Sequence, residues 1–319
     1  MKRIYVVMLL AMMSVLSYAQ NQSEILERRY NLLVEKVGLA GIGVETVLDA
    51  WAKVDSTNLN MQLGRFRYYL TKGQTTSVVA KAEKKYLGLD PVLSLKDSLG
   101  KDVFYFQEVV FDDELYGQAV KAAEKAVSAW PDRLDFRFMK ANAYISYEKE
   151  SPDMTLAYLK NLISENNSRK SPWDFDGTKA DENFFEDAMQ EYCFTFYTIG
   201  SQSSYEAFLN LSQLLSKLYP DNMGFINNIG SYYLLKQDYK SALKYYDKVL
   251  KKHPDDLTAA KNAQLAARKM KNVKLEKKYL ELIVKYDEGK DASGAPDFKP
   301  FVEKVVSAYR TGDSFSYFA

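Results

Sequence analysis

The sequence MGFINNIGSYYLLKQDYKSALKYYDKVLKKHP, residues 223–254, contains two apolar stripes of helical period separated by a short polar turn. Apolar residues recur three and four positions apart on both sides of this turn, as expected for two amphipathic helices. Asp238 is placed to cap the second helix, and Pro254 disfavours its continuation. Because so short a turn joins the helices, we expect them to run antiparallel, with Gly230 and Ala242 where the backbones approach closely.

Each predicted helix has one apolar face. These faces consist of Phe225, Ile226, Ile229 and Tyr233 in the first helix, and of Tyr239, Ala242, Leu243, Tyr246, Val249 and Leu250 in the second. A single hairpin of this kind would leave its outer apolar side in water, so it needs neighbouring hairpins to cover it. The stretch therefore predicts a repeat array.

Residues 223–254 resemble a tetratricopeptide repeat (TPR), a helical hairpin of about 34 residues. Taking Met223 as the first position, the signature positions are Ile226, Ile229, Gly230, Tyr233, Ala242, Tyr246, Val249 and Pro254. Gly230, Tyr233, Ala242 and Pro254 are residues that the family prefers, whereas Ile226 and Val249 replace commoner residues. The resemblance implies an all-α fold: an α-solenoid of antiparallel hairpins wound into a right-handed superhelix.

Together with weaker matches elsewhere, the resemblance covers about two thirds of the chain after the predicted signal. Residues 115–131 repeat the second-helix half, and residues 135–166 form a further pair with a longer turn. Another pair is predicted over residues 183–220, with one extra residue in its second helix. Residues 259–287 and 44–70 give signature-poor helices.

The first 19 residues are typical of a secretory signal peptide. They combine a short basic start, an apolar run and small residues before a cleavage site after Ala19. The apolar run is shorter than the roughly 20 residues that a membrane helix needs. Gln20 would follow the cut and no cysteine precedes Cys193, so we expect no lipid anchor and no transmembrane segment in the mature chain. The protein is therefore predicted to be periplasmic or secreted.

The predicted organisation follows these signals. It comprises a signal peptide at 1–19, an N-terminal block of degenerate hairpins at 20–165, a polar inter-repeat loop at 166–181, a C-terminal block at 182–290, and a loop, capping helix and tail at 291–319.

Composition excludes several functional classes. The chain has 319 residues, 47% of them hydrophobic, and a formal net charge of +1, so no general attraction to nucleic acid or anionic membrane is expected. With one cysteine and one histidine, neither an intramolecular disulfide nor a zinc site built from several such ligands can form. We expect no cofactor.

Candidate chemistry is sparse. Asp174, Asp176 and Gly177 suggest a calcium loop, but the glutamate needed at the twelfth position of an EF-hand is replaced by Asn183, which favours a plain loop. His253 at a helix end has no second imidazole to assist it. Cys193, in an aromatic-rich helix, is interpreted as a buried small residue. These observations predict that the protein is not an enzyme.

The resemblance also implies a binding face, because first helices of family repeats line a concave groove. Carried onto this chain, the groove-facing residues are Leu234 and Leu235, Leu265, and the candidate ligand-binding set Tyr192, Phe196, Asn227, Asn228, Ser231, Lys261, Arg268 and Lys269. Amides can pair with a peptide backbone and cations with a carboxylate. Family members that grip a C-terminal carboxylate use a set of Lys and Asn residues. Asn228 matches one position of this set, but the partnering lysine in the preceding hairpin is missing and Thr258 stands at another position.

Two functions follow from the sequence. The leading prediction is a non-enzymatic scaffold or adaptor of the bacterial cell envelope that binds a protein or peptide in the groove of a TPR solenoid. The alternative is an accessory protein that handles glycans or another substrate, since 24 tyrosines and 17 phenylalanines could contact sugars.

Overall fold

The computed structural model describes the backbone of residues 2–286, and the side chains of residues 20–286 except Glu182. The chain divides into two compact units, Met1–Phe185 and Glu186–Ala319. The division falls inside a helix, α7, and not at the polar segment 166–181. The predicted capping helix and tail at 291–319 lie outside the described residues.

The first unit contains six helices, the start of α7 and two small sheets in its described part. The helices are α1 (Lys2–Val37), α2 (Val44–Val54), α3 (Leu59–Lys72), α4 (Asp113–Ala129), α5 (Leu134–Glu148) and α6 (Asp153–Ser168). Successive helices pack on one another from α1 to α6 except where a sheet intervenes, and there α3 packs directly on α4. Helical side-chain stripes of α1 to α5 share one core around the buried rings of Trp51, Phe66 and Tyr116.

The N-terminal helix α1 runs through the predicted cleavage site after Ala19. Within the described part of the chain, no helix combines the length and apolar character that a membrane span requires. The signal peptide stays a prediction.

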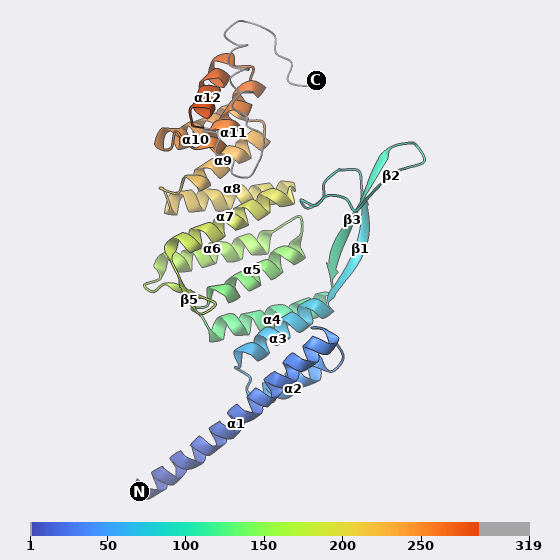
Figure 1. Cartoon of the computed structure of the whole chain (residues 1–319), viewed down its shortest axis with the longest axis vertical. Coiled ribbons are helices and arrows are strands. Elements are labelled where there is room, and N and C mark those ends of the chain that lie inside the picture. Colours follow the sequence, from blue (N-terminus) through green and yellow to red (C-terminus); the bar gives the residue numbers. More distant parts are fainter. Residues whose placement is uncertain (1, 287–319) are drawn as a thin grey trace. The chain divides into compact units, whose positions relative to one another are not determined.

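A three-stranded antiparallel sheet is inserted between α3 and α4, in the order β1–β3–β2 (Figure 1). Its strands are β1 (Gln74–Lys81), β2 (Leu93–Lys96) and β3 (Asp102–Phe111). One face buries Phe104 and Phe106 beneath the loop after β1, where the ring of Tyr86 lies 5.7 Å from that of Phe106. The opposite face leaves Val78, Leu93, Leu95 and Val109 exposed.

Residues 166–181, predicted as a polar loop, contain a short hairpin of β4 (Trp173–Phe175) and β5 (Thr178–Ala180). Trp173 is buried, its Nε1 donates to Oδ1 of Asn166 at 2.7 Å, and the guanidinium of Arg169 lies 3.6 Å from its ring centre. The prediction of an all-α fold therefore holds for most of the chain but not for these five strands.

The second unit is helical throughout its described residues. It contains most of α7 (Glu182–Ile199), followed by α8 (Gln202–Leu218), α9 (Met223–Leu235), α10 (Tyr239–Lys252), α11 (Leu257–Lys269) and α12 (Val273–Tyr286). From α8 onward each helix packs on the next. The predicted hairpin at 223–254 is confirmed as α9 and α10, and the Asp238 carboxylate caps α10 by accepting from the amide of Ser241 at 3.1 Å.

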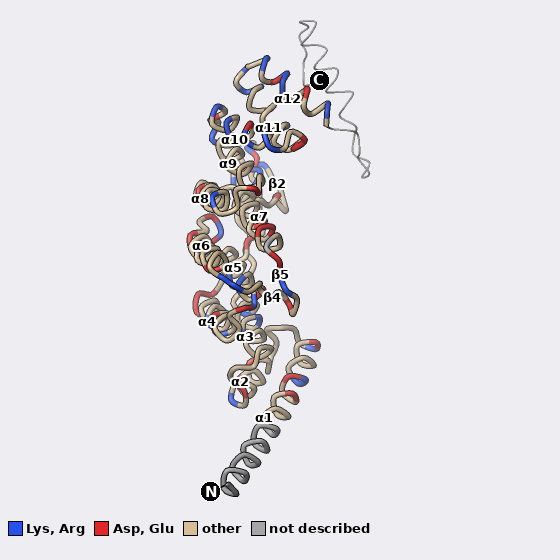
Figure 2. The backbone as a smooth tube through the Cα atoms, turned by 90° about the vertical axis from the view of Figure 1, so that its left-hand side faces the viewer, with Lys and Arg blue, Asp and Glu red and all other residues tan. Residues whose placement is uncertain are grey.

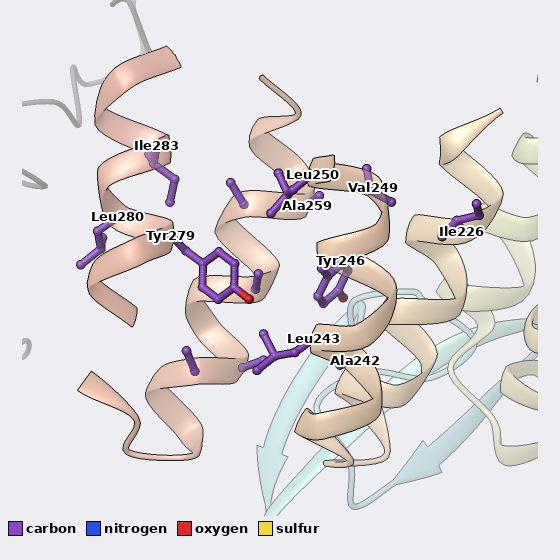
Figure 3. Close-up of a cluster of buried hydrophobic side chains, with 14 of the residues drawn as sticks. Ile226, Ala242, Leu243, Tyr246, Val249, Leu250, Ala259, Tyr279, Leu280 and Ile283 are labelled. Atoms are coloured by element: carbon purple, nitrogen blue, oxygen red, sulfur yellow. The ribbon is translucent and has the colours of Figure 1, made fainter. Parts of the chain in front are cut away.

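Close packing of this unit depends on small residues. Ala259, Ala260, Ala263, Ala266 and Ala267 are all buried on α11, which lets α10 and α12 approach it from either side. Leu243 of α10 and Tyr279 of α12 point toward α11 from these two sides (Figure 3). Gly230 of α9 gives the same kind of space to the buried ring of Tyr246.

Candidate functional site

The first helices of the hairpins in the second unit, α7, α9 and α11, each keep one accessible stripe. On α9 most positions are buried, and Asn228, Ser231 and Leu235, spaced three and four residues apart, remain accessible. Lys261, Leu265 and Arg268 form the corresponding stripe of α11. On α7 the most exposed aromatic residue is Phe194, at 58%, whereas Phe184 and Tyr197 are each 37% exposed.

Hydrogen bonds show that these stripes are neighbours. The amides of Gln190 on α7 and Asn228 on α9 bond reciprocally, with Nε2 to Oδ1 at 3.0 Å and Nδ2 to Oε1 at 2.9 Å. The helices α9 and α11 contact each other directly. We call the accessible set the first-helix face; it consists of Phe194, Asn228, Ser231, Leu235, Lys261, Leu265 and Arg268.

Apolar side chains on the first-helix face are exposed, as are Tyr197 and Val273 elsewhere in the same unit. Phe194, Leu235 and Leu265 are all accessible, although their helices have well-filled buried faces. An amide and a lysine, Asn228 and Lys261, belong to the same accessible set. This mixture of apolar contact area and polar side chains is suited to binding a partner chain.

Two aromatic residues predicted for this face lie elsewhere. Tyr192 and Phe196 are buried, so they pack within the protein and do not present their rings to a ligand. The exposed ring, Phe194, lies between them in sequence. The register of α7 was carried over from the repeat at 223–254, across a second helix that has one extra residue. A shift of two positions moves a helical side chain to a different face.

The predicted polar residues differ in exposure, and several of them, Lys261 and Arg268 included, already interact with other side chains or the backbone. Asn227 is buried, and no hydrogen-bond partner of its Oδ1 is found in the described part of the chain. Ser231 accepts from the hydroxyl of Tyr246 at 3.2 Å. The Nε of Arg268 donates to the buried carboxylate of Glu276 at 2.7 Å, an acceptor that Gln264 shares. Lys261 and Lys269 are exposed.

Possible catalytic and metal-binding groups are used in packing. Cys193 is buried, the hydroxyl of Ser212 contacts its sulfur at 3.5 Å, and burial raises the pKa of the thiol to about 12. Asp174 and Asp176, the calcium-loop candidates, instead face the guanidinium of Arg133 at 3.2 and 3.7 Å. Residues 20–286 contain no group of three or more His, Cys, Asp or Glu side chains that could hold a metal ion.

Basic and acidic residues are interspersed along the described helices (Figure 2), without one dominant sign.

The helices, their packing and the first-helix face define a helical-repeat protein whose clearest hairpin has the arrangement expected of a TPR. No family model matches the sequence, and no curated protein does.

Among solved structures, 38 chains are similar to this one. One is a crystal structure of MamA protein, at 15% identity, covering 57% of this chain and 87% of that chain with a TM-score of 0.38.

Proposed function

We propose that this protein is a non-enzymatic scaffold of the bacterial cell envelope, which binds a protein or peptide segment against the first-helix face. The observation that carries the proposal is the exposure of Phe194, Leu235 and Leu265 on neighbouring helices. Apolar side chains in contact with water are less favourable than buried ones. A partner chain that covers them would therefore gain free energy on binding.

The polar residues on this face fit an extended partner. Asn228 and Lys261 can pair with backbone amides and carboxylates of a bound segment. Reciprocal bonding to Gln190 holds the Asn228 amide in place before binding. Because the helices are already packed, binding would require little ordering of the scaffold, which lowers its entropic cost.

Site-specific photocrosslinking tests the proposal. A photoreactive residue at position 194 or 265 is expected to capture one envelope protein in living cells. The same residue at position 273 is the control, because Val273 is 52% exposed, begins α12 and is not one of the residues of the first-helix face. The captured protein should be lost when Phe194→Glu or Leu265→Glu is introduced and kept with Val273→Glu. Equal capture at all three positions, or at none, would contradict the proposal.

Export is a separate part of the proposal and is tested by intact mass. The protein recovered from the envelope fraction should begin at Gln20, as cleavage after Ala19 requires. A chain that retains Met1, or that stays in the cytoplasm, would overturn the predicted location.

The glycan-binding alternative is less well supported, since Tyr192 and Phe196, the aromatic residues of the candidate ligand-binding set, are buried. Glycan-array binding that is lost with Phe194→Ala, in a protein that captures no polypeptide, would favour that alternative.

A further inference from the structure

A groove of about 710 Å³ lies between α1 and α2 in the first unit, far along the sequence from the first-helix face. It lies after Ala19, so it would remain in a processed chain. Its lining consists of Ile25, Arg28, Arg29, Leu32, Leu33 and Lys36 from α1, and Gly43, Thr46 and Val47 from α2.

The floor of this groove is apolar and accessible. Leu32 is 58% exposed and Ile25 is 45% exposed, although the opposite side of the same helix buries Tyr30 against α2 and α3. Ile25, Leu32 and Lys36 are seven and four residues apart, so they form one stripe along α1. This stripe has no covering helix among residues 20–286, whereas an inner helix of a repeat array is covered on both sides.

The charged residues lining the groove are all basic. Arg28, Arg29 and Lys36 line it, and no Asp or Glu does. Arg28 donates from Nε to the backbone oxygen of Glu24 at 3.4 Å, and none of the three cations is ion-paired within the described residues. Acidic residues of α1 lie off the groove; Glu27, for instance, accepts from Asn60 of α3.

Shape and charge together indicate the occupant. The stripe from Ile25 to Lys36 is about 16 Å long at the α-helical rise, or about three turns. A concave channel between two helices fits a rod and not a flat bilayer surface, and the cations favour carboxylates. We propose that the α1–α2 groove binds an amphipathic α-helix of a partner protein, whose apolar stripe is flanked by Asp and Glu residues. This surface is distinct from the first-helix face and does not depend on it.

Two designed peptides of about four helical turns test the proposal directly. Both carry leucines at positions i, i+4, i+7 and i+11; one has glutamates flanking this stripe, and the other has lysines there. The purified protein should bind the glutamate peptide at least about tenfold more tightly than the lysine peptide in fluorescence anisotropy, with a preference that shrinks as salt rises.

Substitutions identify the surface. Leu32→Glu, and separately Arg28→Glu with Arg29→Glu, should each weaken binding of the glutamate peptide by about tenfold or more. Leu99→Glu and Lys84→Glu are matched controls, because both residues are exposed in the loops of the sheet and line no part of the groove. These controls should bind like the unaltered protein. Unchanged far-UV circular dichroism would show that the variants fold.

Other occupants give different results. Equal affinity for the two peptides, or binding unaffected by Leu32→Glu, would overturn the proposal. So would binding to vesicles containing an anionic lipid that requires Leu32 and is not displaced by the glutamate peptide, since that would indicate a membrane. Self-association in sedimentation that Leu32→Glu abolishes and the peptide leaves intact would indicate a second copy of this chain and would equally overturn it.

Discussion

Gly230 of α9 lies against Tyr246, and a Cβ atom there would come within 2.6 Å of Cε1 of that ring. Tyr246 is fully buried between helices, so the ring has little room to move away. Gly230→Ala is therefore expected to destabilise the second unit by about 1–3 kcal/mol despite the higher helix propensity of alanine. Urea unfolding followed by circular dichroism measures the effect.

The matched control is Gly117→Ala in α4, where a Cβ atom would have no neighbour within 4 Å. There only helix propensity and unfolded-chain entropy should act, giving a stabilisation of about 0.5–1 kcal/mol. Similar effects at both positions would mean that contact with Tyr246 does not decide the outcome at Gly230.

The thiol of Cys193 should be unreactive in the folded protein. It is fully buried, and burial raises its pKa to about 12, so almost no thiolate is present near neutral pH. Ellman's reagent at pH 8 is expected to titrate no thiol under native conditions and one thiol in denaturant. Phe194→Cys supplies the control, since its side chain would sit on the exposed face and should react at once. Rapid native labelling of Cys193 would contradict its burial.

Features of single residues could be predicted from the sequence where they depend only on residues a few positions away. The Asp238 cap depends only on a side chain and an amide three residues later, and the structure confirms it. Gly230 was predicted to lie where two backbones approach, and in the structure the close neighbour at this position is the ring of Tyr246. The exposure of Phe194 was not predicted, because it depends on which side of α7 packs against neighbouring helices. The sequence does not distinguish Phe194 from Tyr192, Cys193 and Phe196, which are buried on the same helix.

Among the elements, the inserted sheet is fastened to the helices through Glu108 on β3. Its Oε1 accepts from Nζ of Lys149, at the end of α5, at 2.8 Å, and from the hydroxyl of Tyr86 at 3.1 Å. The hydrogen bond from Lys149 is the main cause of the lowered pKa of Glu108, to which Tyr86 and the charge of Lys81 also contribute. These contacts join strand, loop and helix.

Glu108→Gln should loosen this attachment in a pH-dependent way. A lowered folded-state pKa means that the stabilisation is present above the ordinary value of 4.5 and is lost as pH falls through the folded-state pKa. At pH 7 we expect amide protection in β1 and β3 to fall by about tenfold, corresponding to one charge-assisted hydrogen bond. In more acidic solution, the variant and the unaltered protein should converge.

Glu83→Gln is the control for the sheet, because Glu83 is exposed in the loop that follows β1. It should leave amide protection unchanged at every pH. A loss of protection that is the same at pH 7 and in acid would show that Glu108 acts through its shape and not through its charge.

The inserted sheet was not predicted from the sequence, although its strands carry recognisable signals. The runs VVAK before Ala82 and VFYFQEVVF before Asp112 are rich in β-branched and aromatic residues, and Gly100 marks a turn between β2 and β3. These signals indicate strands. They conflict with a repeat pattern that assigns every apolar run to a helix, and the exposed face of the sheet weakens the alternation that a half-buried strand shows.

For the whole molecule, the repeat pattern predicted the helical hairpins better than the boundary between the two compact units. Apolar residues at helical spacing give the hairpins, but the boundary between compact units depends on contacts between distant residues. The polar segment 166–181 was predicted to separate two blocks; instead Trp173 fastens its hairpin to the first unit, and the division falls within α7. Buried Trp173 among polar residues was the available sign of this attachment.

The division into units makes a testable prediction because all three tryptophans, Trp51, Trp130 and Trp173, lie in the first unit. Tryptophan fluorescence therefore reports on that unit alone, whereas far-UV circular dichroism reports on both. In repeat arrays destabilisation spreads weakly beyond neighbouring repeats. Gly230→Ala should shift the dichroism transition to lower urea and leave the fluorescence midpoint in place.

The reverse experiment uses Gly64→Ala on α3, where a Cβ atom would lie 2.9 Å from Leu48 and 3.0 Å from the ring of Tyr30. This substitution overpacks the core around Trp51, so the fluorescence midpoint should move to lower urea. The part of the dichroism transition that belongs to the second unit should stay in place. If each substitution instead shifted both signals together, the chain would unfold as one cooperative body, because strain introduced in either unit would be shared through α7.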